Sequence, residues 1–292
     1  MTSSPPVSWP ALIESPDTQA LIELSLREDI GDGDVTSEAI FAPDIRATAV
    51  IAARQPTVVC GLPLAEHLFK RLDPDAIISE SLDEGSTAQA GQAIMRIESN
   101  LRALLTAERT VLNFLMRLSG IATAAQQAQA AVPTGCHTKI YDTRKTTPGW
   151  RGLEKAAVAT GGAHNHRFGL FDAVLIKDNH VAEMGSVGEA VRRCRAQVGT
   201  KMIVQVEIDH LEQLEEALVA GPDIVLLDNL SCELMRQAVE QTRGRAELEA
   251  SGGIRIERIP EIARTGVDRI SMGALTHTVM PADLGLDMEV HP

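Results

Sequence analysis

Positive charge gathers in one segment of an otherwise acidic chain. From Lys139 to Lys177 there are seven Lys and Arg residues against three acids, a balance of 7 − 3 = +4, whereas the formal net charge of the whole chain is −13. The residues that could hold an anion are Arg144, Lys145, His166, Arg167 and Lys177. Arginine pairs with planar carboxylates through two hydrogen bonds, and lysine acts as a point charge. We therefore expect a small, highly charged anion to bind here.

Two plainer alternatives apply to this segment. The basic residues could line a solvated helix face, but several follow strand-like runs and lie beside Gly and Pro turns. His166 taken alone could equally be a buried histidine that is satisfied within the protein. Its place between Asn165 and Arg167, shortly after Gly161-Gly162, favours a binding role.

Two carboxylates each end an apolar, strand-like run. Glu207 and Asp228 lie 228 − 207 = 21 positions apart, about one βα unit, so adjacent parallel strands would bring them to one rim. Such a pair facing basic groups predicts a Mg²⁺ site completed by substrate phosphates. Each acidic residue could instead cap the helix after its strand. Asn229 is the better candidate for a cap after Asp228.

Two small-residue loops follow the last strand-like runs. They are Ser251-Gly252-Gly253 and Ser271-Met272-Gly273. Backbone N–H groups of such loops after late barrel strands commonly hold a phosphate. A single Gly-Gly pair is usually only a turn, but two loops at the same level of successive strands favour a phosphate site.

Arg109 lies apart from these residues, on a helix predicted over residues 101–118. Its ordinary role would be a surface ion pair with Glu108 or Glu98. It could also reach the site of another subunit.

Composition excludes several classes of protein. The 292 residues are 44% hydrophobic and 23% charged, which is ordinary for a globular protein, but only 3% are aromatic. Few rings and a negative charge argue against nucleic-acid binding. The four cysteines are far apart, which argues against zinc or redox pairs and is typical of a cytoplasmic protein. We expect no signal peptide in Met1–Pro6 and no membrane span.

The two parts of the chain differ in pattern. The first mixes helices, at 19–28 and 101–118, with strands at 47–53, 57–61 and 93–98. An acidic turn at 29–34 is expected to end in a cap at Thr36 or Ser37. The second alternates short β-branched runs with helical stretches, which predicts a parallel α/β barrel or a doubly wound sheet. The expected strands are 138–142, 173–177, 203–207, 224–228, 248–251 and 269–273. Residues 284–290 look like an edge strand returning to the first domain.

These motifs resemble the quinolinate phosphoribosyltransferase family over nearly the whole chain. The most specific run is Asp142-Thr143-Arg144-Lys145-Thr146-Thr147-Pro148-Gly149 followed by Asn165-His166-Arg167. Further matching stretches are 28–36, 107–113, 118–123, 177–180, 227–229 and 251–254. The chain departs from the family at Ala163, where a third glycine is usual, and at Trp150, where leucine is common.

The resemblance implies an N-terminal α/β sandwich domain, residues 1–118 and 277–292, and an incomplete parallel α/β barrel, residues 119–276. The implied pentosyltransferase reaction joins quinolinate to phosphoribosyl pyrophosphate and gives nicotinate mononucleotide, pyrophosphate and CO₂, a step of NAD biosynthesis. The implied quinolinate ligands are Arg144, His166, Arg167 and Lys177, with Arg109 from the partner of a homodimer. The implied residues for phosphoribosyl pyrophosphate and Mg²⁺ are Lys145, Glu207 and Asp228. The 5-phosphate would bind Ser251, Gly252, Gly253, Ser271 and Gly273.

Three other functions remain open at this level. One is a related phosphoribosyltransferase acting on another base, for instance in molybdenum-related metabolism. A second is a Schiff-base lyase with Lys177 or Lys145 as nucleophile, although both lie among other charged residues. A third is a sensor that only binds the metabolite, which would not need Lys145, Glu207 and Asp228 together.

Overall fold

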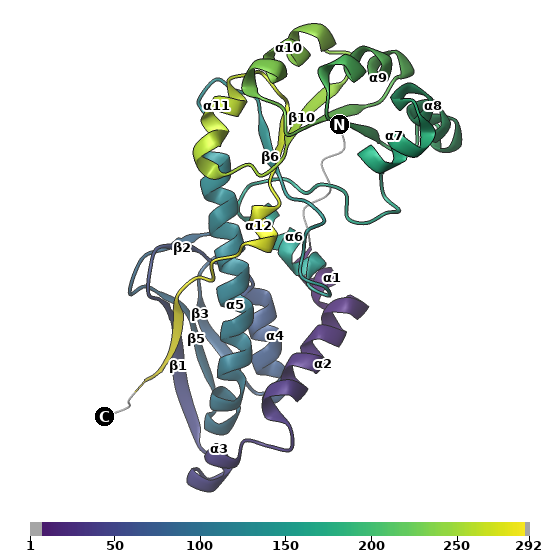
Figure 1. Ribbon diagram of the computed structural model, residues 1–292. Coiled ribbons are helices and arrows are strands. Elements are labelled where there is room, and N and C mark those ends of the chain that lie inside the picture. The colour runs from purple at the N-terminus through teal and green to yellow at the C-terminus, as the bar shows by residue number, and fades with distance from the viewer. Residues whose placement is uncertain (1–7, 290–292) are drawn as a thin grey trace. The chain divides into compact units, whose positions relative to one another are not determined.

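The computed structural model describes residues 8–289, which form two compact units (Figure 1). Within the described residues, the first unit comprises 8–126, 146–162 and 279–289, and the second comprises 127–145 and 163–278. The sequence-based division, 1–118 and 277–292 against 119–276, differs from these units and stays a prediction. Met1–Pro6 and Val290 lie outside the described residues. Within the described part, no helix combines the length and apolar character needed to cross a membrane.

The first unit contains a four-stranded antiparallel sheet in the order β12-β1-β5-β3. Its strands are β1 (Arg46–Ala53), β3 (Ile77–Ser81), β5 (Ala93–Asn100) and β12 (Leu284–Met288). A two-stranded ribbon, β2 (Thr57–Val58) with β4 (Thr87–Ala88), completes the strands. The predicted strands at 47–53 and 93–98 correspond to β1 and β5, while β2 is shorter than predicted.

Six helices accompany this sheet. They are α1 (Trp9–Ile13), α2 (Pro16–Ile30), α3 (Val35–Ile40), α4 (Leu62–Leu72), α5 (Leu101–Ala130) and α6 (Arg151–Thr160). The prediction that the long helix ends at residue 118 was wrong, because α5 continues to Ala130. The predicted cap at Thr36 or Ser37 was also wrong: the Asp34 carboxylate accepts from the Ser37 N–H at 3.0 Å and caps α3.

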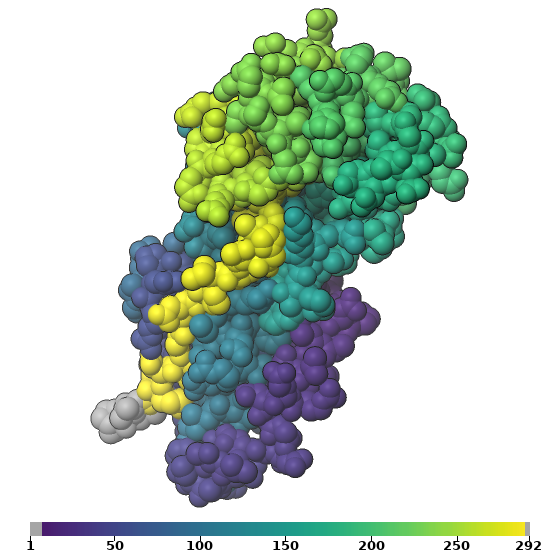
Figure 2. Space-filling view, in the orientation of Figure 1, coloured from purple at the N-terminus to yellow at the C-terminus, as the bar shows by residue number. Residues whose placement is uncertain are grey.

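The C-terminal segment returns to the first unit and pairs with it. β12 runs antiparallel to β1, with Ala49 opposite Met288 and Ala53 opposite Leu284, as expected for a returning edge strand. The Ala282 N–H also donates to the Met116 carbonyl on α5 at 2.8 Å. A Cβ on Gly120 would collide with the Met280 carbonyl, so this close approach requires glycine. Figure 2 shows the yellow segment lying along the teal surface.

The second unit is built on six parallel strands in the order β6-β11-β10-β9-β8-β7. They are β6 (Lys139–Tyr141), β7 (Val174–Ile176), β8 (Val204–Ile208), β9 (Ile224–Asp228), β10 (Glu247–Ser251) and β11 (Arg269–Ser271). The first strand in sequence pairs with the last, and the intervening strands follow in order. This is the order of a barrel opened between β6 and β7, so the unit is barrel-like and the predicted α/β fold class is confirmed.

Helices follow the strands of this unit and cover its sheet (Figure 1). They are α7 (Asp178–Met184), α8 (Val187–Val198), α9 (Leu214–Ala220), α10 (Cys232–Thr242), α11 (Ile259–Ala263) and α12 (Ala274–His277), with 3-10 turns η1 (Leu211–Gln213) and η2 (Ile256–Arg258). The strands are buried and aliphatic, for example Val204, Val206 and Val225. Burial on both faces explains why these strands appear as short apolar runs in the sequence.

Candidate active site

The carboxyl ends of four neighbouring strands gather predicted site residues at one rim. Glu207 lies near the end of β8, while Asp228, Ser251 and Ser271 end β9, β10 and β11. Ser251 is the direct register partner of Asp228. Parallel strands present these ends together, which is the position of active sites in parallel α/β barrels.

The two rim carboxylates repel each other. Burial raises the pKa of Glu207, the nearby Asp228 raises it further, and Lys177 opposes both effects. Neither carboxylate caps the helix after its strand. His210 and Gln213 are the N-cap residues of η1 and α9, and Ser231 caps α10, its Oγ accepting from Leu234 N–H at 3.3 Å. The suggestion that Asn229 is this cap was therefore wrong. Asn229 has a φ of 55° and donates to Asp228 Oδ2 at 2.7 Å.

This donor set fits a hard cation that takes its remaining ligands from substrate. A divalent cation between Glu207 and Asp228 would relieve the burial and repulsion that raise the pKa of Glu207. No group of three or more His, Cys, Asp or Glu within residues 8–289 is arranged to hold a metal. Mg²⁺ commonly binds one or two carboxylates together with substrate phosphates, so Glu207 and Asp228 suit that mode.

The glycine loops allow the backbone to approach a ligand closely. Gly252 has a φ of 107°, and a Cβ there would collide with Asn229 Oδ1. Gly273 precedes α12, and a Cβ on it would lie 3.0 Å from Lys145 Cδ. The Lys145 carbonyl accepts from Thr276 Oγ1 at 2.8 Å. The fold thus brings the exposed Lys145 side chain to the Gly273 loop.

Two arginines lie close together beside this rim. Burial lowers the pKa of Arg167 and the neighbouring Arg144 lowers it further, while Asp172 acts in the opposite direction. One Arg167 amino group donates to the Ala173 carbonyl at 3.1 Å. Its Nε is buried and has no hydrogen-bond acceptor within residues 8–289. A partly desolvated arginine beside a second cation has the chemistry to pair with an anion that carries two negative groups.

The loop that carries His166 and Arg167 is fixed by a residue that the sequence did not single out. Asp142, which is fully buried, accepts from the His166 backbone N–H at 2.7 Å. Its own N–H donates to the His164 carbonyl at 3.0 Å. The only sequence signal was an acid placed directly after the β6 run.

Behind His166 lies a second residue that the sequence did not predict. Glu249, in the middle of β10, has no exposed surface, and its Oε1 is 3.4 Å from His166 Nε2. Its Oε2 lies 3.0 Å from Nε of Arg269 on β11. The available signal was an acid between the apolar Leu248 and Ala250 of a buried strand, where an ionised group needs a partner.

The remaining predicted residues are exposed. Lys177 directly precedes α7, and its N–H donates to His180 Nδ1 at 2.9 Å. Arg109 lies exposed on α5, in the first unit, whereas the other predicted site residues belong to the second. Its suggested surface partner Glu98 pairs with Arg46 at 3.4 Å.

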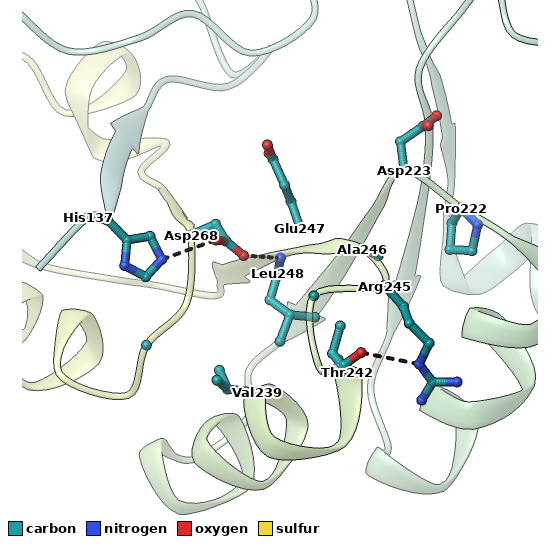
Figure 3. A pocket seen from close by; sticks show the side chains of 12 residues that line it. His137, Pro222, Asp223, Val239, Thr242, Arg245, Ala246, Glu247, Leu248 and Asp268 are labelled. Atoms are coloured by element: carbon teal, nitrogen blue, oxygen red, sulfur yellow. Dashed lines mark hydrogen bonds and ion pairs between the residues drawn. The ribbon is translucent and has the colours of Figure 1, made fainter. Parts of the chain in front are cut away.

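A pocket of about 520 Å³ lies at the opposite end of the parallel strands (Figure 3). Its acidic residues precede or begin strands, namely Asp223, Glu247 and Asp268. Asp223 accepts from Val204 N–H at 2.7 Å, and Asp268 accepts from Leu248 N–H at 2.8 Å. Asp223 and Asp268 therefore each hold the first residue of a neighbouring strand in place, which is a structural role. These bonds fix the register of the strands at this end. Active sites of parallel α/β barrels lie at the opposite, carboxyl end of the strands.

The comparisons with known proteins cover both units. Residues 34–119 match the family model described as quinolinate phosphoribosyl transferase, N-terminal domain, and residues 121–287 match its C-terminal domain. The probable nicotinate-nucleotide pyrophosphorylase [carboxylating] of Bacillus subtilis is 41% identical over 261 residues, 89% of this chain and 90% of the relative. The Mycobacterium leprae protein named nicotinate-nucleotide pyrophosphorylase [carboxylating] is 41% identical over 91% of this chain and 95% of its own length.

A solved structure extends the match to three dimensions. The nicotinate-nucleotide pyrophosphorylase from Francisella tularensis has a TM-score of 0.89 at 39% identity, covering 95% of this chain and 99% of that one. The match includes the sheet unit and the barrel-like unit that carries the rim residues. The chain belongs to the quinolinate phosphoribosyltransferase family.

Proposed function

We propose that the protein transfers the phosphoribosyl group of phosphoribosyl pyrophosphate to quinolinate, with decarboxylation, to give nicotinate mononucleotide. The observation that carries this proposal is the Arg144 and Arg167 pair. Arg167 is partly desolvated and lies beside a second cation, which lowers its pKa. A ligand with two adjacent carboxylates would offset both charges, and quinolinate is such a ligand.

The pyridine nitrogen is the nucleophile, so no side chain has to attack. A bond forms between this nitrogen and C1 of the ribose as the bond from C1 to the pyrophosphate oxygen breaks. Pyrophosphate leaves with the electron pair of that bond. The quaternised ring then loses its adjacent carboxylate as CO₂, and the electron pair left on carbon takes a proton from solvent. The protein contributes mainly by holding the reactants in line and stabilising charge.

The rim residues would serve the phosphoribosyl substrate. Lys145 would meet the departing pyrophosphate, and the loops with Ser251, Gly252, Gly253, Ser271 and Gly273 would hold the 5-phosphate through backbone N–H groups. Glu207 and Asp228 would hold Mg²⁺. When bound, this ion would neutralise charge on the leaving pyrophosphate. Arg144, Arg167 and Lys177 would hold the carboxylates of quinolinate.

We also propose a homodimer in which Arg109 acts in the site of the partner. Arg109 is the one predicted ligand on the sheet unit, and closed two-fold dimers are the commonest oligomers. A cytoplasmic location is proposed as well, supported by four cysteines that are all free thiols.

One assay tests the reaction. The purified protein is supplied with quinolinate, phosphoribosyl pyrophosphate and Mg²⁺, and nicotinate mononucleotide and CO₂ are measured. We expect both products in equal amounts and none without the metal. Product formation from another pyridine base but not from quinolinate would indicate a related transferase. Borohydride trapping on a lysine would indicate the lyase alternative, which the exposure of Lys145 and Lys177 disfavours.

A further inference from the structure

The backbone around His166 is held on one side by the end of β6. The His164 N–H donates to the Ile140 carbonyl at 2.8 Å, and the His166 N–H donates to Asp142 Oδ1 at 2.7 Å. The segment therefore continues the sheet past β6 through a parallel bridge between Tyr141 and His164. The ring of His166 extends from a fixed backbone.

One nitrogen of this ring accepts a hydrogen bond. The backbone N–H of Arg167 donates to His166 Nδ1 at 2.8 Å. A nitrogen that accepts from an N–H carries its lone pair there and no proton. In an imidazolium both nitrogens bear protons, so that form would set two N–H groups against each other. The neutral ring with its proton on Nε2 is the form that suits this contact.

The other nitrogen faces a buried carboxylate. Nε2 lies 3.4 Å from Glu249 Oε1, and the His166 side chain is only 9% exposed. Both Glu249 side-chain oxygens are buried and have no hydrogen-bond partner within residues 8–289. Oε1 is therefore available to accept from Nε2, although 3.4 Å is longer than an ordinary hydrogen bond.

The carboxylate is neutralised from the side away from the histidine. Arg269 is the register partner of Glu249 on β11, and its Nε is 3.0 Å from Glu249 Oε2. The Arg269 guanidinium also lies 3.8 Å from the centre of the Tyr141 ring, a cation–π contact. The charge of Glu249 is thus balanced by Arg269, and His166 does not need to be a cation.

We propose that Glu249 is a positioning residue that holds His166 as the neutral tautomer, with its proton on Nε2. Nδ1 then accepts from the Arg167 N–H, and the Nε2 proton faces Glu249 Oε1. The charge that meets a dicarboxylate comes from Arg144, Arg167 and Lys177, and His166 fixes the Arg167 backbone through Nδ1. The identity of that ligand rests on the proposed function, whereas the tautomer does not.

Nitrogen NMR of the unliganded protein tests the tautomer directly. Ring-¹⁵N histidine is incorporated, and the His166 resonances are identified by their loss in His166→Gln. We expect an unprotonated resonance for Nδ1 and a protonated one for Nε2 at neutral pH. An imidazolium pair, or the proton on Nδ1, overturns the proposal. Because no substrate is present, absence of transferase activity would sink the proposed function and leave this result standing.

Two matched double variants test the role of the carboxylate. On an Arg269→Met background, which removes the buried guanidinium, position 249 is changed to Gln or to Leu. Gln keeps an oxygen acceptor for Nε2–H, and Leu removes it. The Gln variant should keep the wild-type tautomer and bind quinolinate nearly normally in calorimetry. The Leu variant should show mixed tautomers and about tenfold weaker binding, the size typical for a residue that orients a histidine.

The two variants distinguish a Glu249 that positions neutral His166 from a Glu249 that forms an ion pair with cationic His166. If His166 were a cation paired with Glu249, neither Gln nor Leu would support it, and equal losses in both variants would contradict the proposal. Glu247→Gln is the control, since Glu247 is half exposed and lies 3.6 Å from the same arginine but does not contact His166. It should leave the His166 resonances unchanged. If the double variants do not fold, the wild-type spectrum still decides the tautomer.

Discussion

At the scale of single residues, the proposed metal carboxylates should separate turnover from quinolinate binding. Asp228→Ala removes a charge that faces the phosphates, so we expect kcat to fall about a hundredfold or more, as for ~3 kcal/mol of transition-state stabilisation. Quinolinate affinity measured without the second substrate should change little. Asp209→Asn, at an exposed acid near Glu207, is the control and should keep most of the turnover. Loss of quinolinate binding with normal turnover at saturation would contradict the assignment.

The two adjacent glycines of the phosphate loop should respond differently to the same change. A Cβ on Gly252 meets Asn229, whereas a Cβ on Gly253 meets open space. We expect Gly252→Ala to raise KM for phosphoribosyl pyrophosphate strongly. Gly253→Ala should cost only the strain of a φ of 55°, about 1 kcal/mol. Steady-state kinetics on both variants measures this, and equal effects would argue against a loop shaped by Asn229.

The arginine pair should discriminate between two carboxylates and one. Nicotinate lacks the second carboxylate that would offset the partly desolvated Arg167 charge, a loss of ~3 kcal/mol. We expect kcat/KM for quinolinate to exceed that for nicotinate by about a hundredfold or more. Arg167→Gln should shrink this ratio chiefly by weakening quinolinate. Equal values for both substrates with the unaltered enzyme would rule out the pair as the source of selectivity.

Residues at strand ends could be found from the sequence, and those inside strands could not. Glu207 and Asp228 each follow an apolar run, so their position at the rim was predictable from the period of the βα units. Glu249 lies within a run, where one acid gives no indication of what it contacts. Its partners, His166 and Arg269, come from a loop 83 positions earlier (249 − 166) and a strand 20 positions later (269 − 249). The register of β10 and β11 brings Arg269 to Glu249, and the loop tied to the end of β6 brings His166.

At the scale of elements, the parallel strands were easier to predict than the antiparallel ones. The former are buried on both faces and form short β-branched runs, whereas β3 is largely exposed and carries Ser and Glu among its residues. No apolar alternation marks it, so it was missed together with β4 and α4. The end of α5 was missed for a different reason. The leucines that marked this helix end at Leu118, but the helix continues through Gly120, which contacts the Met280 carbonyl.

A buried ion pair holds α6 to α5. Glu154 has no exposed surface, and it lies 2.5 Å from the Arg117 guanidinium. That guanidinium also lies 5.3 Å from the centre of the Trp150 ring. Arg117→Met would leave the carboxylate buried without its partner, so we expect a loss of ~3 kcal/mol in the free energy of unfolding.

Denaturant titration of the variant checks this, with an exposed pair for comparison. Lys70 and Glu66 are about half exposed and four residues apart on α4, so Lys70→Met should cost ~0.5 kcal/mol or less. A loss for Arg117→Met as small as that for Lys70→Met would mean that water reaches Glu154.

At the scale of the whole molecule, the shared-site proposal predicts complementation. Arg109→Ala and Lys145→Ala are each expected to be inactive, and they are refolded together in equal amounts. If Arg109 acts in the partner's site, a mixed dimer has one competent site. The site on the Lys145→Ala chain contains both substitutions, and the second site contains neither. Random pairing makes about half the dimers mixed, so activity should recover to about a quarter of wild type. No recovery, with subunit exchange confirmed by mass spectrometry, would mean that Arg109 acts within its own chain or has no role.

The return of β12 to β1 has a consequence for synthesis on the ribosome. Residues 49–53 are made more than 230 residues before their partners at 284–288 (284 − 53 = 231). Until then one edge of the first sheet stays unpaired, and unpaired edges invite association with other chains. A chain stalled before residue 284 would therefore display this edge, and chaperones that bind extended segments would be expected to hold it. Residues 284–288 end this exposure when they pair with β1.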